Sequence, residues 1–161
     1  MKKNLIEEYY NRHYNSLFFY AYSLTKNKSD AEDLVSSAFL KSIVSFTDGN
    51  LNAWMYKVIR NEFINKYIKN KRVEFFEDSF RQDASADDLL SDYISQEEKR
   101  WLYEQIFLLP LKERQIMILS SYHDLNDQDI ADIINITISN VRVIKHRARA
   151  KLLKKYKEVW E

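Results

Sequence analysis

Basic and amide side chains suited to nucleic-acid contact gather near the C-terminal end of the chain. Residues 142–157 hold eight basic side chains and no acidic one. Arg142 carries the forked group that pairs with the major-groove edge of guanine, and Val143 can touch a thymine methyl group. A basic run is also compatible with an ordinary solvated helix face, so the elements that carry it must decide between the two interpretations.

The residues around this basic run predict a helix-turn-helix, in which two helices pack at a steep angle around a short turn. The motif needs a small residue where the helices touch and a residue between them that tolerates positive φ; Ala131 and Asn135 take these positions. The second helix is expected to begin near Ser139 and to place its N-terminal part in the major groove. The predicted inner face consists of Ile130, Ile134, Ile136, Val141, Ile144, Ala148 and Leu152.

Seven outward-facing side chains of this second helix are the candidate contacts to duplex DNA. They are Asn140, Arg142, Val143, Lys145, His146, Arg147 and Arg149. The basic members beyond Arg142 are better suited to phosphates, which position a protein without reading sequence. Residues 142–157 of this helix hold no acid that could pair with Arg147 or Arg149, which favours phosphate contact for both.

A second group of basic side chains, interleaved with aromatic ones, lies in residues 51–72. This stretch predicts one long helix with Leu51, Met55 and Ile59 on one side. Trp54, Lys57 and Arg60 also lie along it, a combination that can stack on unpaired bases while neutralising phosphates. Core packing beside a solvated basic face would give the same pattern, so this signal is less specific than the helix-turn-helix.

The segments before residue 51 also predict helices. Residues 4–25 repeat apolar side chains at steps of three and four. Ser29 and Glu32 have the spacing of a capping box, and an amphipathic stripe follows from Ala31 to Phe46 with Leu40 on its polar face. Gly49 suits a left-handed turn, and Asn50 can cap the next helix.

An acidic segment separates the two helical regions. Residues 73–95 hold one basic and seven acidic side chains, a balance of −6, and lose the helical period. Residues 1–72 hold 12 basic and 7 acidic side chains, and residues 96–161 hold 12 and 10. With only one glycine and one proline in the chain, these patterns predict an all-α fold: two small helical domains, 1–72 and 96–161, joined by a flexible linker at 73–95.

Several classes of protein are disfavoured by composition. The chain lacks cysteine, and its three histidines lie far apart without metal-ligand spacing, so no metal site or cofactor is expected. No stretch approaches the roughly 20 apolar residues of a membrane span, and the N-terminus lacks a signal-peptide core. We therefore expect a cytoplasmic protein that does not insert into membranes. An enzyme is the least favoured class, because adjacent acids such as Asp87 and Asp88 have no glycine-rich loop or nucleophile–base pair beside them.

Taken together, these motifs resemble the extracytoplasmic-function group of the sigma-70 class of bacterial transcription initiation factors. The resembling segments are Asp30–Val35 with Phe39, Ala53–Asn61, Leu109-Pro110 with Arg114, Asp129–Ala131, Val141-Arg142 and His146–Arg149. Each match is moderately specific, but their order and spacing agree over nearly the whole chain, apart from the linker. The chain departs from the family pattern at Ser36-Ser37, at Asn135 in place of the usual glycine, and at Ile138–Asn140.

This resemblance implies an alternative sigma factor that binds core RNA polymerase and directs promoter recognition, DNA melting and initiation. Its partners would be the polymerase, duplex DNA at the −35 element, the melted strand at the −10 element and an anti-sigma factor. The implied polymerase-binding residues are Asp30, Glu32, Asp33, Leu34 and Leu40. The implied −10 residues are Asp48, Asn50, Leu51, Asn52, Trp54, Lys57, Arg60 and Asn61.

Two other functions are compatible with parts of the sequence. A stand-alone helix-turn-helix regulator would bind duplex DNA without polymerase, but it leaves the matches at Asp30–Phe39 and Trp54–Asn61 unexplained. A helical adaptor protein would show no dependence on DNA at all. The joint match of all the motifs favours the sigma factor over both.

Overall fold

The computed structural model describes residues 2–69, 86–122 and 124–161, and the regular elements among them are helical. The first half of the chain forms α1 (Lys2–Thr25), α2 (Lys28–Ser45), α3 (Leu51–Phe63) and a π-helical turn, η1 (Ile64–Lys69). The second half forms α4 (Ala86–Tyr93), α5 (Glu97–Phe107), α6 (Leu111–Ser120), α7 (Asp127–Ile134) and α8 (Ile138–Trp160). The all-α prediction is confirmed.

Helix α2 has the predicted apolar stripe but begins at a different cap. Ala31, Leu34, Val35 and Ala38 are buried, largely against α1. The N-cap is Asn27, whose side chain accepts a hydrogen bond from the Asp30 amide at 3.0 Å. The predicted capping box at Ser29 is therefore wrong. Asparagine caps a helix as well as serine does, and Asn27 lies two residues before Ser29.

The turn between α2 and α3 was predicted correctly. Gly49 has a φ of 96°, and the Asn50 side chain accepts from the Ala53 amide at 3.2 Å as the N-cap of α3. Helix α3 buries Met55, Tyr56, Ile59 and Phe63. The expected single helix over 51–72 instead changes to the wider η1 turn at Ile64, and its last residues, 70–72, lie outside the described part of the chain.

Part of the predicted linker is folded. Residues 86–93 form α4, with Leu90 and the following Ile94 buried. Tyr93 packs against Phe18 and Phe19 of α1, with ring centroids 5.8 and 5.1 Å apart. This segment was predicted as linker because its acidic composition hides a short amphipathic helix. The rest of that stretch, residues 73–85, lies outside the described residues.

The predicted helix-turn-helix is confirmed as α7, a turn and α8. Asn126 caps α7 in a reciprocal capping box with Asp129. Asn135 adopts the left-handed conformation, with φ 58° and ψ 51°. Thr137 caps α8, and Val141, Ala148 and Leu152 form its buried face. Pro110 directly precedes α6, where its missing N–H leaves no helical hydrogen bond unmade.

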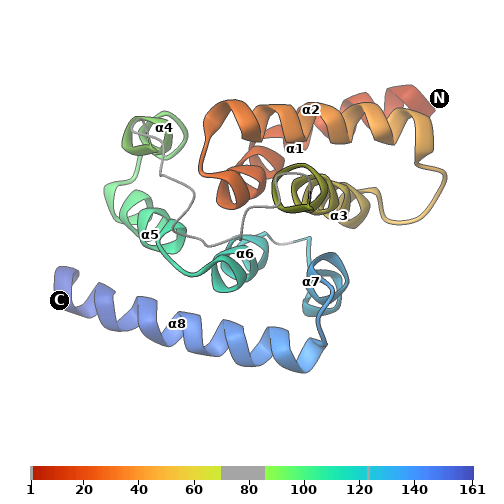
Figure 1. The fold of residues 1–161 in the computed structure, drawn as a ribbon. Helices are drawn as coiled ribbons and strands as arrows, with labels where there is room; N and C mark the ends of the chain where they lie inside the picture. Colours follow the sequence, from red (N-terminus) through yellow and green to blue (C-terminus); the bar gives the residue numbers. More distant parts are fainter. Residues whose placement is uncertain (1, 70–85, 123) are drawn as a thin grey trace.

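The two halves of the molecule share one hydrophobic core. In Figure 1, α6 and α7 lie between the first-half helices on one side and α8 on the other. α1 packs on α6 and α3 packs on α7, and we call this contact the central interface. Hydrogen bonds that cross it include Tyr20 Oη–Gln115 Oε1 (2.9 Å), Arg114 Nε–Ser23 O (2.5 Å) and Tyr122 Oη–Ser16 O (2.8 Å). Burial raises the pKa of Tyr20 and of Tyr122, so both phenols stay neutral donors.

Candidate nucleic-acid and polymerase interfaces

The N-terminal part of α8 presents most of the predicted DNA-reading side chains to solvent. Asn140, Arg142, Val143, His146, Arg147 and Arg149 are exposed. Val143 keeps 45% of its surface, although an apolar side chain gains nothing from exposure. This face is therefore free to enter a groove, with basic side chains around an apolar one.

Lys145 does not belong to that exposed face. Its side chain is only 18% exposed, and its Nζ donates to Oδ1 of Asp127 at 2.5 Å. The expectation that Lys145 points outward is wrong, because this position of α8 faces the first residue of α7. Sequence reasoning considered acids within α8 alone and missed this acid on the neighbouring helix.

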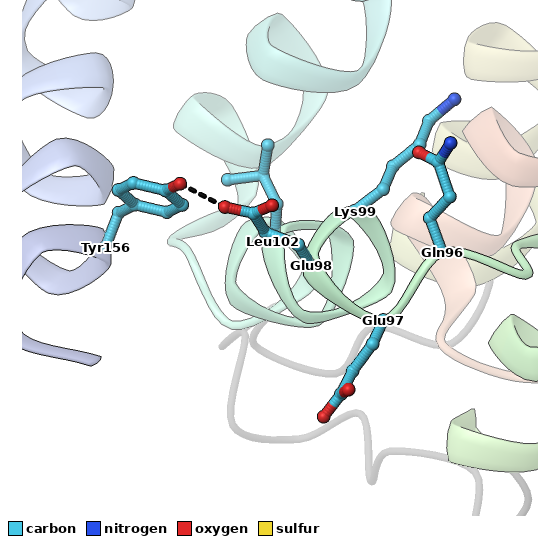
Figure 2. Close-up of a pocket in the computed structure, with 6 residues that line it drawn as sticks. All are labelled: Gln96, Glu97, Glu98, Lys99, Leu102 and Tyr156. Atoms are coloured by element: carbon cyan, nitrogen blue, oxygen red, sulfur yellow. Dashed lines mark hydrogen bonds between the residues drawn. The ribbon is translucent and has the colours of Figure 1, made fainter. Parts of the chain in front are cut away.

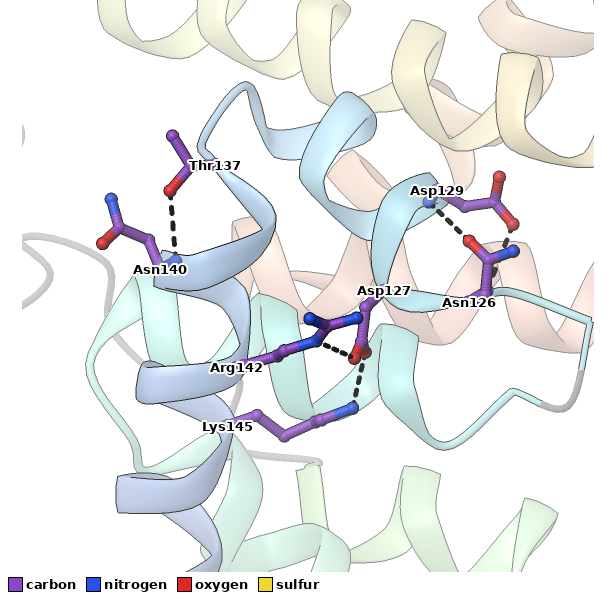
Figure 3. Close-up of polar contacts among 7 residues, drawn as sticks. All are labelled: Asn126, Asp127, Asp129, Thr137, Asn140, Arg142 and Lys145. Atoms are coloured by element: carbon purple, nitrogen blue, oxygen red, sulfur yellow. Dashed lines mark hydrogen bonds and ion pairs between the residues drawn. The ribbon is translucent and has the colours of Figure 1, made fainter.

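Asp127 also pairs with Arg142. Oδ2 of Asp127 accepts from Nε of Arg142 at 3.3 Å, as Figure 3 shows. The hydrogen bond from Lys145, together with that from Arg142, lowers the pKa of Asp127 despite its partial burial. The carboxylate is consequently ionised at physiological pH and links both helices of the helix-turn-helix.

Helix α3 carries the predicted strand-binding side chains on its accessible side. Lys57 and Asn61 are exposed, and Arg60 and Trp54 are partly exposed. The Trp54 ring is held by an edge contact to Phe46, with centroids 5.5 Å apart. The structure thus brings these four side chains together on one element, with an aromatic surface among cationic and amide groups.

The loop before α3 uses some of its predicted binding groups for its own structure. Asn50 caps the helix, and the Oδ1 atom of Asn52 accepts a hydrogen bond from the Tyr9 hydroxyl. The Nδ2 atom of Asn52 is buried without a partner among the described residues. Asp48 is exposed and Leu51 partly exposed, so they are the more accessible members of this predicted set.

The predicted polymerase-binding surface on α2 is acidic and apolar. Glu32, Asp33 and Leu40 are exposed, and Asp30 is partly exposed. Leu34 is only 1% exposed, because it faces the core, so the expectation that it docks on a partner is wrong. Val44, at 82% exposure, lies one turn after Leu40 and was missed, although their spacing of four residues could have revealed an apolar pair.

A depression of about 740 Å³ between α5 and α8 shows no reaction chemistry. Figure 2 shows its lining, Gln96, Glu97, Glu98, Lys99, Leu102 and Tyr156, with the Tyr156 hydroxyl donating to Glu98. No nucleophile–base pair is present in this set. Over the described residues, no group of three or more His, Asp or Glu side chains could hold a metal ion. Within the same part of the chain, no helix combines the length and the apolar character needed to cross a membrane.

Two family models match the chain, one in each half. Residues 9–73 match the model described as Sigma-70 region 2, and residues 99–152 match the model described as Sigma-70, region 4. The first match runs from within α1 through η1, and the second runs from within α5 through most of α8.

Similar curated proteins span most of the chain. The RNA polymerase sigma factor YlaC of Bacillus subtilis is 26% identical over 94% of this chain and 92% of its own length. SigM of the same organism, an ECF RNA polymerase sigma factor, is 27% identical over 91% of this chain and 92% of its own. The ECF sigma factor EcfG of Rhodopseudomonas palustris is 30% identical over 85% and 77%.

Solved structures share the fold over both halves. The sigma factor RpoE of Bartonella quintana, in complex with the anti-sigma factor NepR, superposes with a TM-score of 0.66 at 21% identity, covering 96% of this chain and 98% of that one. CnrH, in complex with the cytosolic domain of CnrY, gives a TM-score of 0.63 at 18% identity, covering 96% and 88%.

Proposed function

Because the chain belongs to the extracytoplasmic-function group of sigma-70 factors, it is an alternative sigma factor, and we propose which of its surfaces bind polymerase and which read the promoter. It binds core bacterial RNA polymerase and directs initiation at a particular set of promoters. Like the rest of this family, it carries no catalytic activity of its own. Its place of action is the cytoplasm, where it meets polymerase and DNA.

The helix-turn-helix reads the −35 element. The observation that carries this assignment is the left-handed turn at Asn135, which sets α8 across α7 and leaves the N-terminal face of α8 exposed. Arg142 and Val143 contact base edges. Asn140, His146, Arg147 and Arg149 border them, and the two arginines contact phosphates.

Helix α3 and the loop before it hold the melted −10 strand. Trp54 offers a stacking surface, and Lys57 and Arg60 neutralise phosphates beside it. Asp48 and Leu51 border the position where a flipped base is captured, with Asn61 further along the helix. Flipping costs a few kcal/mol of unstacking, which stacking and a shaped pocket offset.

Polymerase docks on α2, through the acids Asp30, Glu32 and Asp33 and the apolar pair Leu40 and Val44. Charged side chains around a small apolar centre are typical of protein interfaces. The proposed domain organisation is then region 2 at residues 1–72, an acidic connection at 73–95 and region 4 at 96–161. An anti-sigma factor is a further partner, as NepR is for RpoE in their complex.

The two DNA-reading helices have to separate before both elements are bound. The −10 and −35 elements lie roughly 25 base pairs apart, about 85 Å along B-DNA at 3.4 Å per base pair. We call the arrangement in the structure the closed form. In it α3 is in contact with α7, the helix that packs against the DNA-reading helix α8. Promoter binding therefore requires the central interface to open.

Promoter-directed transcription tests these assignments. Core polymerase, this protein and a genomic promoter library would give new start sites that share two upstream boxes at a fixed spacing. Arg60→Ala and Arg142→Ala should each lower initiation at least tenfold. Lys154→Ala, which removes an exposed charge from the distal part of α8, should leave initiation unchanged.

Two results would contradict the assignments. If Arg142→Ala behaved like Lys154→Ala, α8 would not read the −35 element through this residue. If the protein shifted duplex DNA alone and never bound core polymerase, a stand-alone regulator would replace the sigma factor.

A further inference from the structure

We propose that Asp127 determines −35 specificity as a positioning residue, because it orients Arg142 toward the bases and keeps Lys145 away from the phosphates. The inference rests on the proposed role of α8 at the −35 element. Asp127 is the first residue of α7 and touches no base itself. Its effect is exerted entirely through two side chains on the facing turn of α8.

The contact with Asp127 leaves the two terminal nitrogens of the Arg142 guanidinium free to contact a base. The carboxylate accepts from Nε, on the side of the guanidinium, at 3.3 Å. Both terminal nitrogens have no acceptor among the described residues, and the side chain is 68% exposed. A guanidinium fixed at Nε loses rotamer freedom while its terminal donors remain available for the O6 and N7 atoms of guanine.

Lys145 is held on the other carboxylate oxygen. Its Nζ lies 2.5 Å from Oδ1, and the side chain is mostly buried between the helices. A lysine held in this way cannot reach the DNA backbone. Freed, it would add a phosphate contact that strengthens binding to every sequence alike.

The other acids of α7 do not share this role. Asp129 completes the capping box with Asn126, and Asp132 accepts a hydrogen bond from Gln128 at 3.0 Å. Among the described residues, neither forms a hydrogen bond or ion pair with a side chain of α8. Asp127 is therefore the acid of α7 that joins the two helices. Arg142 and Lys145 carry a charge of +2 together, and with the Asp127 carboxylate the three side chains have a net charge of +1.

Removing the carboxylate should separate specificity from affinity. Arg142 would lose its orientation, so guanine discrimination would fall. Two cations would at the same time become available to phosphates, so binding to unrelated DNA would rise. A merely structural role would weaken binding to all sequences and would not change the order of base preferences.

The experiment uses the complete holoenzyme, which is core polymerase with this protein bound. The template is a promoter that the wild-type protein recognises in the genomic library, with its −35 box randomised. Initiation from the library is sequenced for the wild type, Asp127→Asn and Asp132→Asn. The last is the matched control, because it makes the same charge change on the same helix without touching α8. Thermal unfolding of each variant is measured alongside.

We expect Asp127→Asn to reduce the preference at the position read by Arg142 by roughly tenfold, the scale of one bidentate base contact. Preferences at the other −35 positions should remain. Binding to a duplex of unrelated sequence should strengthen, and its salt dependence should steepen by about one to two phosphate contacts. Asp132→Asn should leave the base preference unchanged.

Three outcomes would overturn the proposal. They are an unchanged base preference in Asp127→Asn, an equal effect of Asp127→Asn and Asp132→Asn, and a further loss when Asp127→Asn is added to Arg142→Ala. A failure of the proposed function looks different. In that case the wild type itself would show no −35 preference, or Arg142→Ala would keep the wild-type preference.

Discussion

Arg114 is almost completely buried, although it carries a charge. Its Nε donates to the Ser23 carbonyl, in the last turn of α1, and its Nη1 donates to the carbonyls of Phe107 and Leu109, where α5 ends. The carbonyls at a helix C-terminus lack partners within the helix and carry partial negative charge. One guanidinium therefore satisfies the ends of two helices and joins the two halves of the molecule.

Arg114→Lys should destabilise the protein by roughly 2–4 kcal/mol. Lysine keeps the charge but cannot donate in three fixed directions, and hydrogen bonds from charged groups are among the stronger ones. Urea unfolding followed by circular dichroism measures the change. Lys112→Met, an exposed change two residues earlier on α6, should cost little, and equal losses for both variants would refute this role of Arg114.

Individual side chains were predicted less well than the helices that carry them. Periodicity gave the buried face of α8 but not the direction of Lys145, because that depends on an acid 18 residues away. Leu34 was assigned to polymerase through family resemblance, although its place in the apolar stripe already indicated burial. The central role of Arg114 arises from contacts about 90 residues apart, which no local pattern encodes.

At the scale of elements, α4 is the unexpected part of the fold. Leu90→Ala should cost about 2–4 kcal/mol of unfolding free energy, because it removes a fully buried side chain from the core. Asp92→Ala, exposed on the same helix, provides the control. Thermal denaturation of both variants measures the two losses of stability. A Leu90→Ala protein as stable as wild type would place α4 outside the core.

The turn between α7 and α8 depends on Asn135. Asn135→Gly should leave stability unchanged or raise it slightly, because glycine adopts positive φ freely. Asn135→Val should cost about 1–2 kcal/mol, because a β-branched side chain strains the left-handed conformation. The measurement is the unfolding midpoint of the two variants, and a valine variant with the wild-type midpoint would contradict this account.

The helix-turn-helix could be predicted because its constraints are local. A small residue, a turn residue and branched apolar residues at fixed offsets define the angle between the helices. The acidic segment was misassigned in part because seven acids over 73–95 outweighed the apolar positions of α4. The cap of α2 was placed at Ser29 instead of Asn27, because the two residues lie two positions apart and both residue types are good N-caps.

At the scale of the whole molecule, the central interface holds the two halves together, and the opening proposed for promoter binding has to break it. Tyr122 donates to the Ser16 carbonyl, and its ring stacks on Tyr56 of α3 at 5.7 Å. Tyr122→Phe keeps the ring and removes the donor. It should lower the stability of the free protein by about 1 kcal/mol, the net value of one hydrogen bond.

The same variant should bind core polymerase up to roughly fivefold more tightly. If polymerase, like the two promoter elements together, is bound by the open form alone, weakening the closed form raises the competent fraction. A fluorescence titration with core polymerase measures this affinity. Tyr156→Phe, which loses a hydrogen bond to Glu98 within the second half, is the control. Equal or weaker binding by Tyr122→Phe would show that opening does not limit polymerase binding.

The long sequence separation across the central interface affects the molecule while it is being synthesised. The hydrogen bonds that join the halves connect residues 91, 95 and 106 positions apart. At about 5–20 residues per second, a ribosome needs roughly 5–20 s to add that length of chain. During this interval the aromatic face of α1 and α3 has no second half to cover it. Every newly made molecule therefore begins in the uncovered state and closes only as its synthesis ends.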